Sequence, residues 1–235
     1  MNSVDVVIPV YNEEVVLSRS VATLRDFLSD HLSCPWQIVI ADNASIDGTL
    51  AIAEELSRQY PDVTCIHLDL KGRGRALRKA WLESDADIVS YMDVDLSTNL
   101  EAFPRLLQAF DEGYDVAIGS RLMSGSKVIG RSLKREITSR GYNTLIKAMF
   151  FPSFGDAQCG FKAVRREVVQ EIVPLIQDQA WFFDTELLLL SGRKGYRIKQ
   201  VPVEWTDDPD TRVDIASTAW EDIKGLVRVR FRPPR

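Results

Sequence analysis

The chain has 235 residues, of which 45% are hydrophobic and 27% are charged, and its formal net charge is -5. This size and composition exclude an intrinsically disordered protein and favour one large α/β domain with a substantial core. The acidic balance argues against a partner bound by broad phosphate neutralisation, so we expect no nucleic-acid partner.

The first half of the chain alternates short β-branched runs with longer amphipathic runs. The β-branched runs predict strands, which cover residues 4–10, 37–41, 63–68, 88–92 and 116–119. The runs between them have helical periodicity and cover residues 13–32, 48–60, 72–84 and 100–112. This alternation predicts an α/β fold with a mostly parallel central sheet flanked by helices on both faces.

Polar residues follow each of the five predicted strands. The carboxyl ends of parallel strands share one edge of a sheet, where such folds bind ligands, so we expect these residues to form one site. In chain order they are Tyr11, Asn12 and Glu13, then Asp42 and Asn43, then the segment from Lys71 to Arg75, then Asp93 and Asp95, and finally Ser120 and Arg121.

The fourth predicted strand ends in two aspartates, Asp93 and Asp95, separated by one residue. Side chains two positions apart on a strand point to the same side, so both carboxylates can reach one divalent cation. This pattern is typical of a metal-diphosphate site.

Each cluster also has a simpler interpretation. Asn12, Glu13 and Glu14 could cap the first helix, and the segment from Asp42 to Thr49 could be an ordinary turn into the second helix. The segment from Lys71 to Arg75 is basic, contains two glycines and opens a helix, which suits phosphate binding, but it lacks the Walker A pattern.

The cysteines and the apolar runs limit where the protein can act. Cys34, Cys65 and Cys159 are widely spaced and odd in number, which indicates packed, reduced thiols. No apolar run approaches the roughly 20 residues that span a bilayer, and the first residues lack the basic region of a signal peptide. We therefore expect a cytoplasmic protein that neither is secreted nor spans a membrane by itself.

Short segments spread along the chain resemble a known family. The segments from Pro9 to Glu14, from Ala41 to Ser45 and from Asp93 to Asp95 resemble the signature of inverting family 2 glycosyltransferases, which have the GT-A fold. The second half is similar to the polyprenyl-phosphate (dolichyl-phosphate) β-glucosyltransferases of that family, through Asp156 to Lys162, Trp181 to Leu188 and Val201 to Trp205. The resemblance extends to about Trp220.

The resemblance implies a donor site on the first four strand ends. The family positions that hold the nucleoside match Pro9, Tyr11, Asn12, Glu13 and Asp42, with Lys71 and Arg75 as further contacts near the nucleotide. Asp95 matches the direct ligand of Mg²⁺ or Mn²⁺, and Asp93 would face the metal or the sugar nucleotide. The cation would neutralise the diphosphate and stabilise the departing nucleotide.

The resemblance also implies an anionic acceptor, because the family transfers a hexose to a lipid phosphate. Such a phosphate needs orientation and charge neutralisation rather than a base. The family positions suited to this role match Arg121, Arg135 and Arg212, although each arginine could instead be a surface salt-bridge partner.

Further residues of the second half match positions near the reaction centre. Asp156 could orient the sugar hydroxyls or assist proton movement, Gln158 could contact the sugar nucleotide, and Asp184 and Glu186 could order the surrounding loops. Three aromatic residues have two interpretations, because they could form a wall for the sugar ring or simply pack in the core. They are Phe161, Trp181 and Phe183.

Two segments are candidates for contact with a membrane surface. Residues 145–154 are unusually apolar beside basic residues, which suits an interfacial helix or an ordinary core helix. Residues 215–235 form a basic amphipathic C-terminal segment after a catalytic domain that we expect to cover residues 1–214.

Together these features predict a metal-dependent hexosyltransferase, peripheral to the cytoplasmic face of a membrane. It would move a hexose, glucose from UDP-glucose, to a polyprenyl phosphate. The alternatives are a family 2 enzyme that uses GDP-mannose or a soluble acceptor, and a non-catalytic module that binds a nucleotide sugar.

Overall fold

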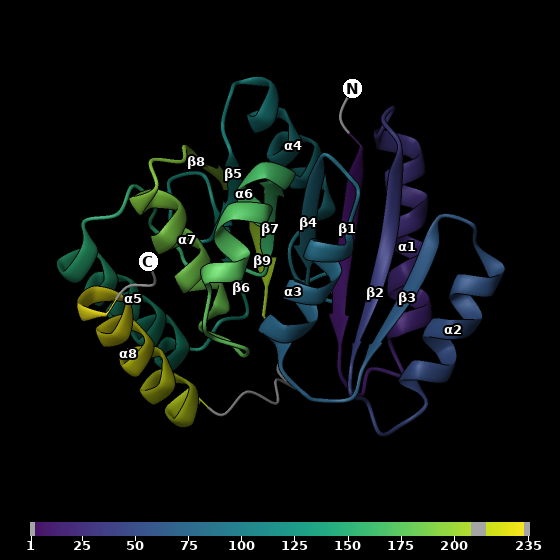
Figure 1. Ribbon diagram of the computed structural model, residues 1–235, viewed down its shortest axis with the longest axis horizontal. Coiled ribbons are helices and arrows are strands. Elements are labelled where there is room, and N and C mark those ends of the chain that lie inside the picture. The colour runs from purple at the N-terminus through teal and green to yellow at the C-terminus, as the bar shows by residue number, and fades with distance from the viewer. Residues whose placement is uncertain (1–2, 208–214, 233–235) are drawn as a thin grey trace.

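A central sheet of seven strands organises the protein (Figure 1). The computed structural model describes residues 3–207 and 215–232, without the side chains of residues 134, 135 and 215–217. The strand order is β3-β2-β1-β4-β7-β5-β8, and every strand is parallel to β1 except β7, which is antiparallel to both of its neighbours. The predicted α/β fold with a mostly parallel sheet flanked by helices is confirmed.

The strands and helices alternate along the chain as far as β5. The strands of the large sheet are β1 (Val4–Val10), β2 (Trp36–Asn43), β3 (Val63–Leu68), β4 (Ile88–Met92), β5 (Val116–Ser120), β7 (Phe161–Arg165) and β8 (Ile198–Pro202). A separate two-stranded parallel ribbon pairs β6 (Lys127–Ile129) with β9 (Glu204–Thr206). The α-helices are α1 (Leu17–His31), α2 (Thr49–Gln59), α3 (Arg73–Glu83), α4 (Phe103–Asp111), α5 (Leu133–Phe150), α6 (Arg166–Ile172), α7 (Phe183–Arg193) and α8 (Ile215–Phe231). Short 3₁₀ turns, η1 (Leu100–Ala102) and η2 (Val173–Leu175), precede α4 and follow α6.

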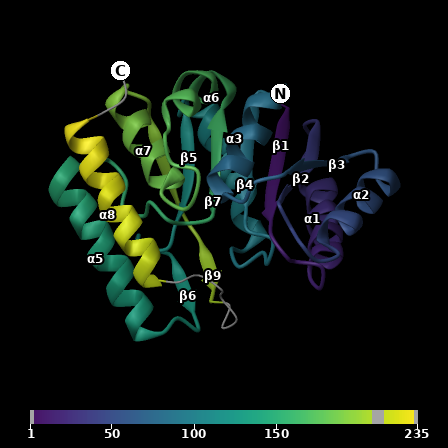
Figure 2. The same ribbon diagram turned by 60° about the horizontal axis from the view of Figure 1, so that its bottom comes forward.

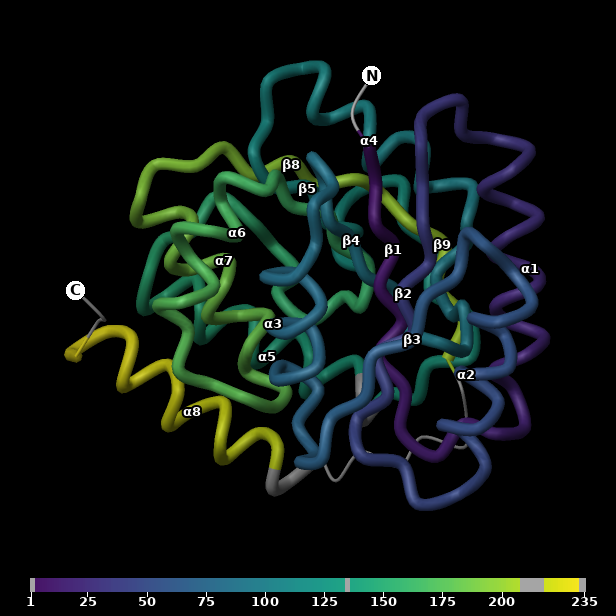
Figure 3. The backbone as a smooth tube through the Cα atoms, turned by 45° about the vertical axis from the view of Figure 1, so that its right-hand side comes forward, coloured from purple at the N-terminus to yellow at the C-terminus, as the bar shows by residue number. Residues whose placement is uncertain are grey.

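The side chains of β1 point alternately to the two faces of the sheet, and a hydrophobic core lies on each face. Val6 and Ile8 pack with α1, α2 and α4, whereas Val7 points to the opposite face and packs with α3 and α7. Figure 3 shows α1 and α2 on one side of β1, β2 and β3 and α3 on the other. Because side chains alternate along a strand, a run that is apolar at every position is buried on both faces.

Each predicted strand and helix of the first half is present, with shifted boundaries. The first helix begins at Leu17 rather than at residue 13, because residues 11–16 form the turn that leaves β1. The polar composition of that turn hides the boundary, since polar residues also open helices.

Helices α5 and α8 lie side by side beyond the β8 end of the sheet (Figure 2). The inner face of α8 contributes Leu226 and Val229 to the core that also contains α7. Among the described residues, no helix combines the length and the apolar character needed to cross a bilayer.

Candidate active site

The carboxyl ends of β1 to β5 meet at one edge of the sheet, which we call the rim. These five strands run in the same direction, so the loops that follow them open on the same side. The rim gathers the polar residues that the sequence predicted to converge. Their roles remain predictions.

The loops after β1 and β2 are hydrogen-bonded to each other. Asn12 has a φ of 57° in the left-handed region, and its Oδ1 accepts from the Ile46 backbone N–H at 2.9 Å. The Asn12 N–H donates to Ser45 Oγ at 3.0 Å, and the Glu13 N–H donates to Thr49 Oγ1 at 2.7 Å. The two loops therefore form one preorganised wall of the rim.

The simpler interpretations of these loops have different outcomes. The N-cap residue of α1 is Val16, which makes no side-chain cap hydrogen bond, so the helix begins after Asn12, Glu13 and Glu14 rather than at them. In contrast, Asp47 Oδ1 accepts from the Thr49 N–H at 2.9 Å, which is the turn into α2 that the sequence suggested.

Asp42 lies at the end of β2 and is fully buried. Its Oδ2 is 2.7 Å from His67 Nδ1, whereas its Oδ1 has no hydrogen-bond partner in the part of the chain that the structure describes. A buried carboxylate oxygen without a partner is costly, so its location at the rim suits a ligand that donates a hydroxyl or an N–H group.

The segment after β3 brings cationic groups to the same wall. Asn43 Oδ1 accepts from the Gly72 N–H at 2.6 Å, which fixes the start of α3. The Lys71 Nζ lies 3.5 Å from the centroid of the Tyr11 ring, and Arg75 Nε is buried without a partner among the described residues. Tyr11, Lys71 and Arg75 thus lie in the neighbourhood that the sequence predicted for the nucleotide.

The two aspartates after β4 have different surroundings. Asp93 Oδ1 forms an ion pair with Arg73 at 3.1 Å, and a Cβ placed on Gly160 would lie 1.8 Å from Asp93 Oδ2. Asp95 is exposed, and its Oδ1 accepts from the Ser97 N–H at 2.9 Å. Asp93 is therefore held by the protein, and Asp95 faces the solvent.

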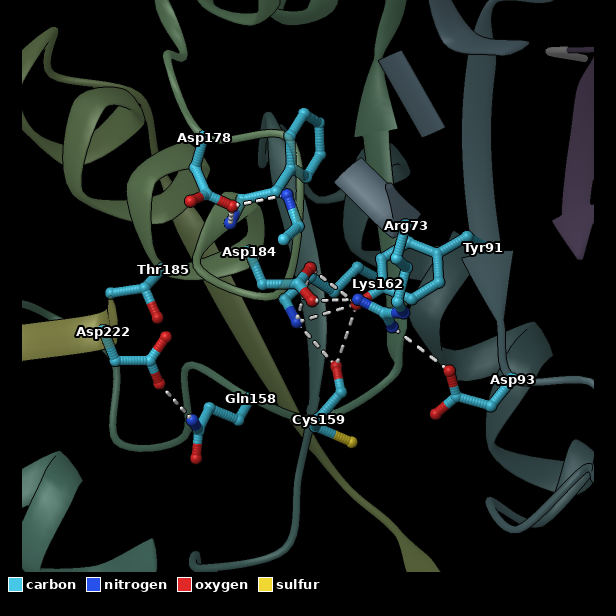
Figure 4. A network of polar contacts seen from close by, with 12 residues as sticks. Arg73, Tyr91, Asp93, Gln158, Cys159, Lys162, Asp178, Asp184, Thr185 and Asp222 are labelled. Atoms are coloured by element: carbon cyan, nitrogen blue, oxygen red, sulfur yellow. Dashed lines mark hydrogen bonds and ion pairs between the residues drawn. The ribbon is translucent and has the colours of Figure 1, made fainter. Parts of the chain in front are cut away.

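Arg73 connects Asp93 to a buried polar network (Figure 4). Its Nη1 lies 2.6 Å from Asp184 Oδ2, and Asp184 Oδ1 accepts from Tyr91 Oη at 2.6 Å. Lys162 Nζ lies 3.2 Å from the same carboxylate and donates to the Cys159 carbonyl at 2.6 Å. Burial opposes ionisation of Asp184, but the charges of Lys162 and Arg73 outweigh it and lower the pKa of Asp184.

Arg121 and Asp156 form a buried bidentate pair. The Arg121 Nε and Nη2 atoms donate to Asp156 at 2.9 and 3.0 Å, and the Arg121 backbone N–H adds a third bond at 2.9 Å. Burial opposes ionisation, but the charge and hydrogen bonds of Arg121 prevail and hold the pKa of Asp156 at about 2. Asp156 therefore stays ionised at neutral pH and is a poor base.

Arg131 is a cation of this region that the sequence interpretation missed. Its guanidinium lies 5.7 Å from the Trp205 ring centroid, and that of Arg121 lies 5.4 Å from the same centroid. Arg131 Nη1 pairs with Glu136 at 2.9 Å, whereas its Nε is buried without a partner among the described residues. Arg73 was missed as well, although it belongs to the basic segment that the sequence identified.

Gln158 lies between Asp156 and the C-terminal helix. Its backbone N–H donates to Asp156 Oδ1 at 3.2 Å, and its side-chain Nε2 donates to Asp222 Oδ2 of α8 at 3.0 Å. Arg135 belongs to the first turn of α5, but its side chain lies outside the described residues, as does all of Arg212. The structure therefore gives the contacts of Gln158, whereas the roles of Arg135 and Arg212 stay predictions.

The three aromatic candidates divide between the core and the surface. Phe161 and Phe183 are fully buried core residues, whereas Trp181 is 45% exposed and stacks with Arg73, whose guanidinium lies 4.9 Å from its ring centroid. Glu186 accepts from the Gln177 and Asp178 N–H groups, as expected of a residue that orders a loop.

The rim offers carboxylates to a divalent cation but not a complete set of protein ligands. Among the described residues, no three histidine, cysteine or acidic side chains lie close enough to hold a metal. Mg²⁺ and Mn²⁺ are often bound by one or two carboxylates together with substrate phosphates. Asp95 and Asp93 meet that requirement if a diphosphate supplies the remaining ligands.

The seven-stranded sheet with helices on both faces has the GT-A fold. Residues 5–173 match the family model of glycosyl transferase family 2, which is well over half of the chain, and the protein belongs to that family.

Relatives cover nearly the whole chain. The glycosyltransferase AglD of Haloferax volcanii is 34% identical over 95% of this chain and 35% of its own length. The dolichyl-phosphate beta-glucosyltransferase of Saccharomyces cerevisiae is 29% identical over 96% of this chain and 73% of its own length. The polyprenol monophosphomannose synthase of Mycolicibacterium smegmatis is 32% identical over 86% of this chain and 77% of its own length. The chain thus spans about a third of AglD.

A solved structure shares the fold. The glucosyl-3-phosphoglycerate synthase of Mycobacterium tuberculosis, in complex with Mn²⁺, UDP and glucosyl-3-phosphoglycerate, superposes with a TM-score of 0.73 at 18% identity. The match covers 100% of this chain and 81% of that one. At this identity the likeness concerns the fold.

Proposed function

We propose that the protein transfers a hexose, glucose from UDP-glucose, to the phosphate of a polyprenyl lipid, with inversion at the anomeric carbon. The observation that carries this proposal is the rim itself, where the Asp42 oxygen that has no partner among the described residues and the Asp93–Asp95 pair lie on one edge of the sheet. A dolichyl-phosphate beta-glucosyltransferase that aligns with 96% of the chain supports the choice of substrates.

The loops after β1, β2 and β3 bind the nucleoside diphosphate. Asp42 Oδ1 accepts a hydrogen bond from the nucleoside, and the wall formed by Tyr11, Asn12 and Glu13 orients it. Lys71 and Arg75 contribute positive charge beside the phosphates. Pro9 lies at the end of β1, in register with Ala41, and keeps these loops adjacent.

Asp95 would hold the divalent cation, with Asp93 next to it. When bound, Mg²⁺ or Mn²⁺ neutralises the diphosphate and stabilises the leaving nucleotide. The ion pair between Arg73 and Asp93 fixes the direction of the Asp93 carboxylate, so that Asp93 orients the donor sugar or the metal without a change of rotamer.

The state of Asp156 favours a phosphate acceptor over a hydroxyl acceptor. A hydroxyl must lose a proton as it attacks, whereas a lipid phosphate is already anionic at neutral pH. With its pKa held at about 2 by Arg121, Asp156 accepts no proton near neutral pH and instead orients the sugar hydroxyls. Arg121, Arg131, Arg135 and Arg212 are the cations that we assign to the acceptor phosphate.

Contact with a membrane surface is assigned to α8 and the adjoining part of α5. Trp220, Ile223, Val227 and Phe231 are exposed on α8 at helical spacing, and Phe151 is 87% exposed after α5. Exposed aromatic side chains beside Arg230 and Arg232 suit the interface of an anionic membrane. We therefore place residues 215–235 as a membrane-binding segment after a catalytic domain of residues 1–214, at the cytoplasmic face.

The assay that tests this function measures label transfer from UDP-glucose or GDP-mannose to polyprenyl phosphate in detergent. Asp95→Ala should abolish transfer, and Asp111→Ala, an exposed aspartate at the opposite edge of the sheet, is the matched control. Transfer from GDP-mannose alone would favour a mannosyltransferase like the M. smegmatis relative. Transfer only to a soluble acceptor would refute the lipid assignment, and donor binding without turnover would favour a binding module.

Flotation with anionic vesicles tests the membrane segment. Replacement of Trp220 and Phe231 by serine should reduce flotation about tenfold, because each side chain buries apolar surface in the interface. Leu82→Ser, which alters an exposed leucine of α3, is the control. Equal flotation of the three proteins would exclude α8 as the contact.

A further inference from the structure

The inner face of α8 carries a buried carboxyl group. Asp222 is 2% exposed, although its neighbours Glu221 and Ile223 are exposed on either side. The residues that complete the inner face, Leu226 and Val229, are apolar and fully buried. An aspartate in this position is a local exception to the pattern of the helix.

The Asp222 carboxyl lies where three helices and one loop meet (Figure 4). Gln158 Nε2 donates to Asp222 Oδ2 at 3.0 Å, whereas Asp222 Oδ1 has no partner that satisfies hydrogen-bond geometry within the described residues. Tyr142 of α5 and Thr185 of α7 bond to each other at 3.0 Å beside it. A half-satisfied buried carboxyl costs stability, and a leucine would pack at less cost, so packing does not account for Asp222.

The loop that contains Gln158 connects Asp222 to the Arg121–Asp156 pair and to Asp93. Its backbone N–H donates to Asp156, which Arg121 holds through its side chain and backbone. Two residues further along, Gly160 lies directly against Asp93. The loop of residues 156–160 therefore contacts the acceptor cations on one side and the carboxylate beside the metal on the other.

The rest of the loop is held by packing and by its backbone, because Ala157 and Cys159 are fully buried. The Ala157 N–H donates to Asn143 Oδ1 of α5 at 3.1 Å, and the Cys159 carbonyl accepts from Lys162. Both of these contacts involve the backbone, so they fix the ends of the short segment around Gln158. Among the described residues, α8 holds the loop through the hydrogen bond from the Gln158 side chain to Asp222.

We propose that Asp222 is a positioning residue, which holds Gln158 and thereby keeps the loop of residues 156–160 in the geometry that transfer requires. This inference rests on the proposed function, because it assigns Asp222 to the same reaction. It makes the docking of α8 a condition for a formed site.

The hydrogen-bonding capacity of the Asp222 carboxyl group allows a conservative substitution, Asp222→Asn, to be compared with a disruptive one, Asp222→Leu. Burial raises the pKa of Asp222 to about 7, with repulsion from Asp178 adding to the effect and the Gln158 bond opposing it. An asparagine has the same shape as the neutral acid, and it offers the same acceptor to Gln158. A leucine fills a similar volume but accepts no hydrogen bond.

The experiment compares Asp222→Asn, Asp222→Leu, Gln158→Leu and the Asp222→Leu/Gln158→Leu double variant. We expect Asp222→Asn to keep kcat within about twofold of the parent and Asp222→Leu to lower kcat about 10- to 100-fold with little change in the donor KM. The double variant should be no slower than Gln158→Leu, since the two residues act in series.

Two controls separate positioning from stability. Leu226→Ala removes a buried apolar side chain of α8 that cannot hydrogen-bond to Gln158, and Glu221→Gln alters the exposed neighbour of Asp222. Both should keep kcat at a temperature at which they are folded. The proposal is overturned if Leu226→Ala lowers kcat as far as Asp222→Leu, if Asp222→Asn is as slow as Asp222→Leu, or if the double variant shows additive losses.

Hydrogen exchange gives a readout that does not depend on turnover. Amides of residues 156–160 should exchange faster in Asp222→Leu than in the parent, in Asp222→Asn or in Leu226→Ala. If the parent transfers no hexose but this pattern is found, the proposed function fails and the positioning of the loop stands. Unchanged exchange in Asp222→Leu overturns the positioning role whatever the activity.

Discussion

The pH dependence of stability offers a test of Asp222 that needs no substrate. The perturbation is Asp222→Asn, which removes the ionisable group and keeps its shape. Burial raises the pKa of this carboxyl most, the charges of Asp178 and Asp184 raise it further, and the hydrogen bond from Gln158 and the nearby Tyr142 hydroxyl lower it. With burial as the largest cause, the pKa rises from 3.8 to about 7 in the folded protein.

The sign and size of the effect follow from proton linkage. Below about pH 4 the group is neutral in both the folded and the unfolded chain, so its contribution is fully present. Between about pH 4 and pH 7 the unfolded chain ionises while the folded chain stays neutral, and stability falls by about 1.4 kcal/mol per pH unit. The loss reaches about 4 kcal/mol near pH 7 and stays constant above it.

The assay is denaturant unfolding of the parent and of Asp222→Asn at several pH values from about 4.5 to about 8.5. The free energy of unfolding of the parent, relative to the variant, should fall across this range and level off above about pH 7. Glu221→Gln, one residue away and exposed, should show no such trend. A difference that is independent of pH, or one that grows in favour of the parent, would refute the reasoning.

Three further substitutions test the rim and the loop. Asp42→Asn should weaken UDP binding about tenfold in calorimetry, because it replaces a charged acceptor at the nucleoside, and unchanged affinity would remove Asp42 from the donor site. Arg121→Ala should lower the free energy of unfolding by about 3 to 5 kcal/mol, since it leaves Asp156 buried without its counter-charge, and a loss below about 1 kcal/mol would contradict the buried pair. Gly160→Ala should displace Asp93 and abolish transfer while the circular dichroism spectrum is retained, because the new Cβ would lie 1.8 Å from Asp93 Oδ2. Gly141→Ala, whose Cβ would meet nothing within 4 Å among the described residues, is its control, and equal activity of the two variants would count against the contact.

The positions of the first five strands along the chain and the convergence of their ends at the rim were predictable because local sequence patterns determine them. A strand such as β1 is apolar at nearly every position, and the polar residues after it stand out in the sequence. Asp42, Asp93 and Asp95 could therefore be assigned to one edge of the sheet from the order of residues alone.

The partners of the buried charges could not be predicted in the same way. Arg73 bonds to Asp184, which is 111 positions away, and Gln158 bonds to Asp222, which is 64 positions away. No periodicity links such residues, since each pair forms only when β7, α7 and α8 take their places. The sequence identified the basic segment from Lys71 to Arg75, but the choice of Arg73 within it depends on where α3 begins.

The position of β7 between β4 and β5 limits how the chain can be divided into fragments that fold. This strand is hydrogen-bonded between β4 and β5, and those two strands are not hydrogen-bonded to each other. A fragment that ends before residue 161 would therefore leave one edge of β4 open and would give β5 neither of its neighbours. Unpaired strand edges recruit strands from other molecules. We expect such fragments to aggregate, and the nascent chain to complete its sheet only after residue 202 at the end of β8 has been synthesised.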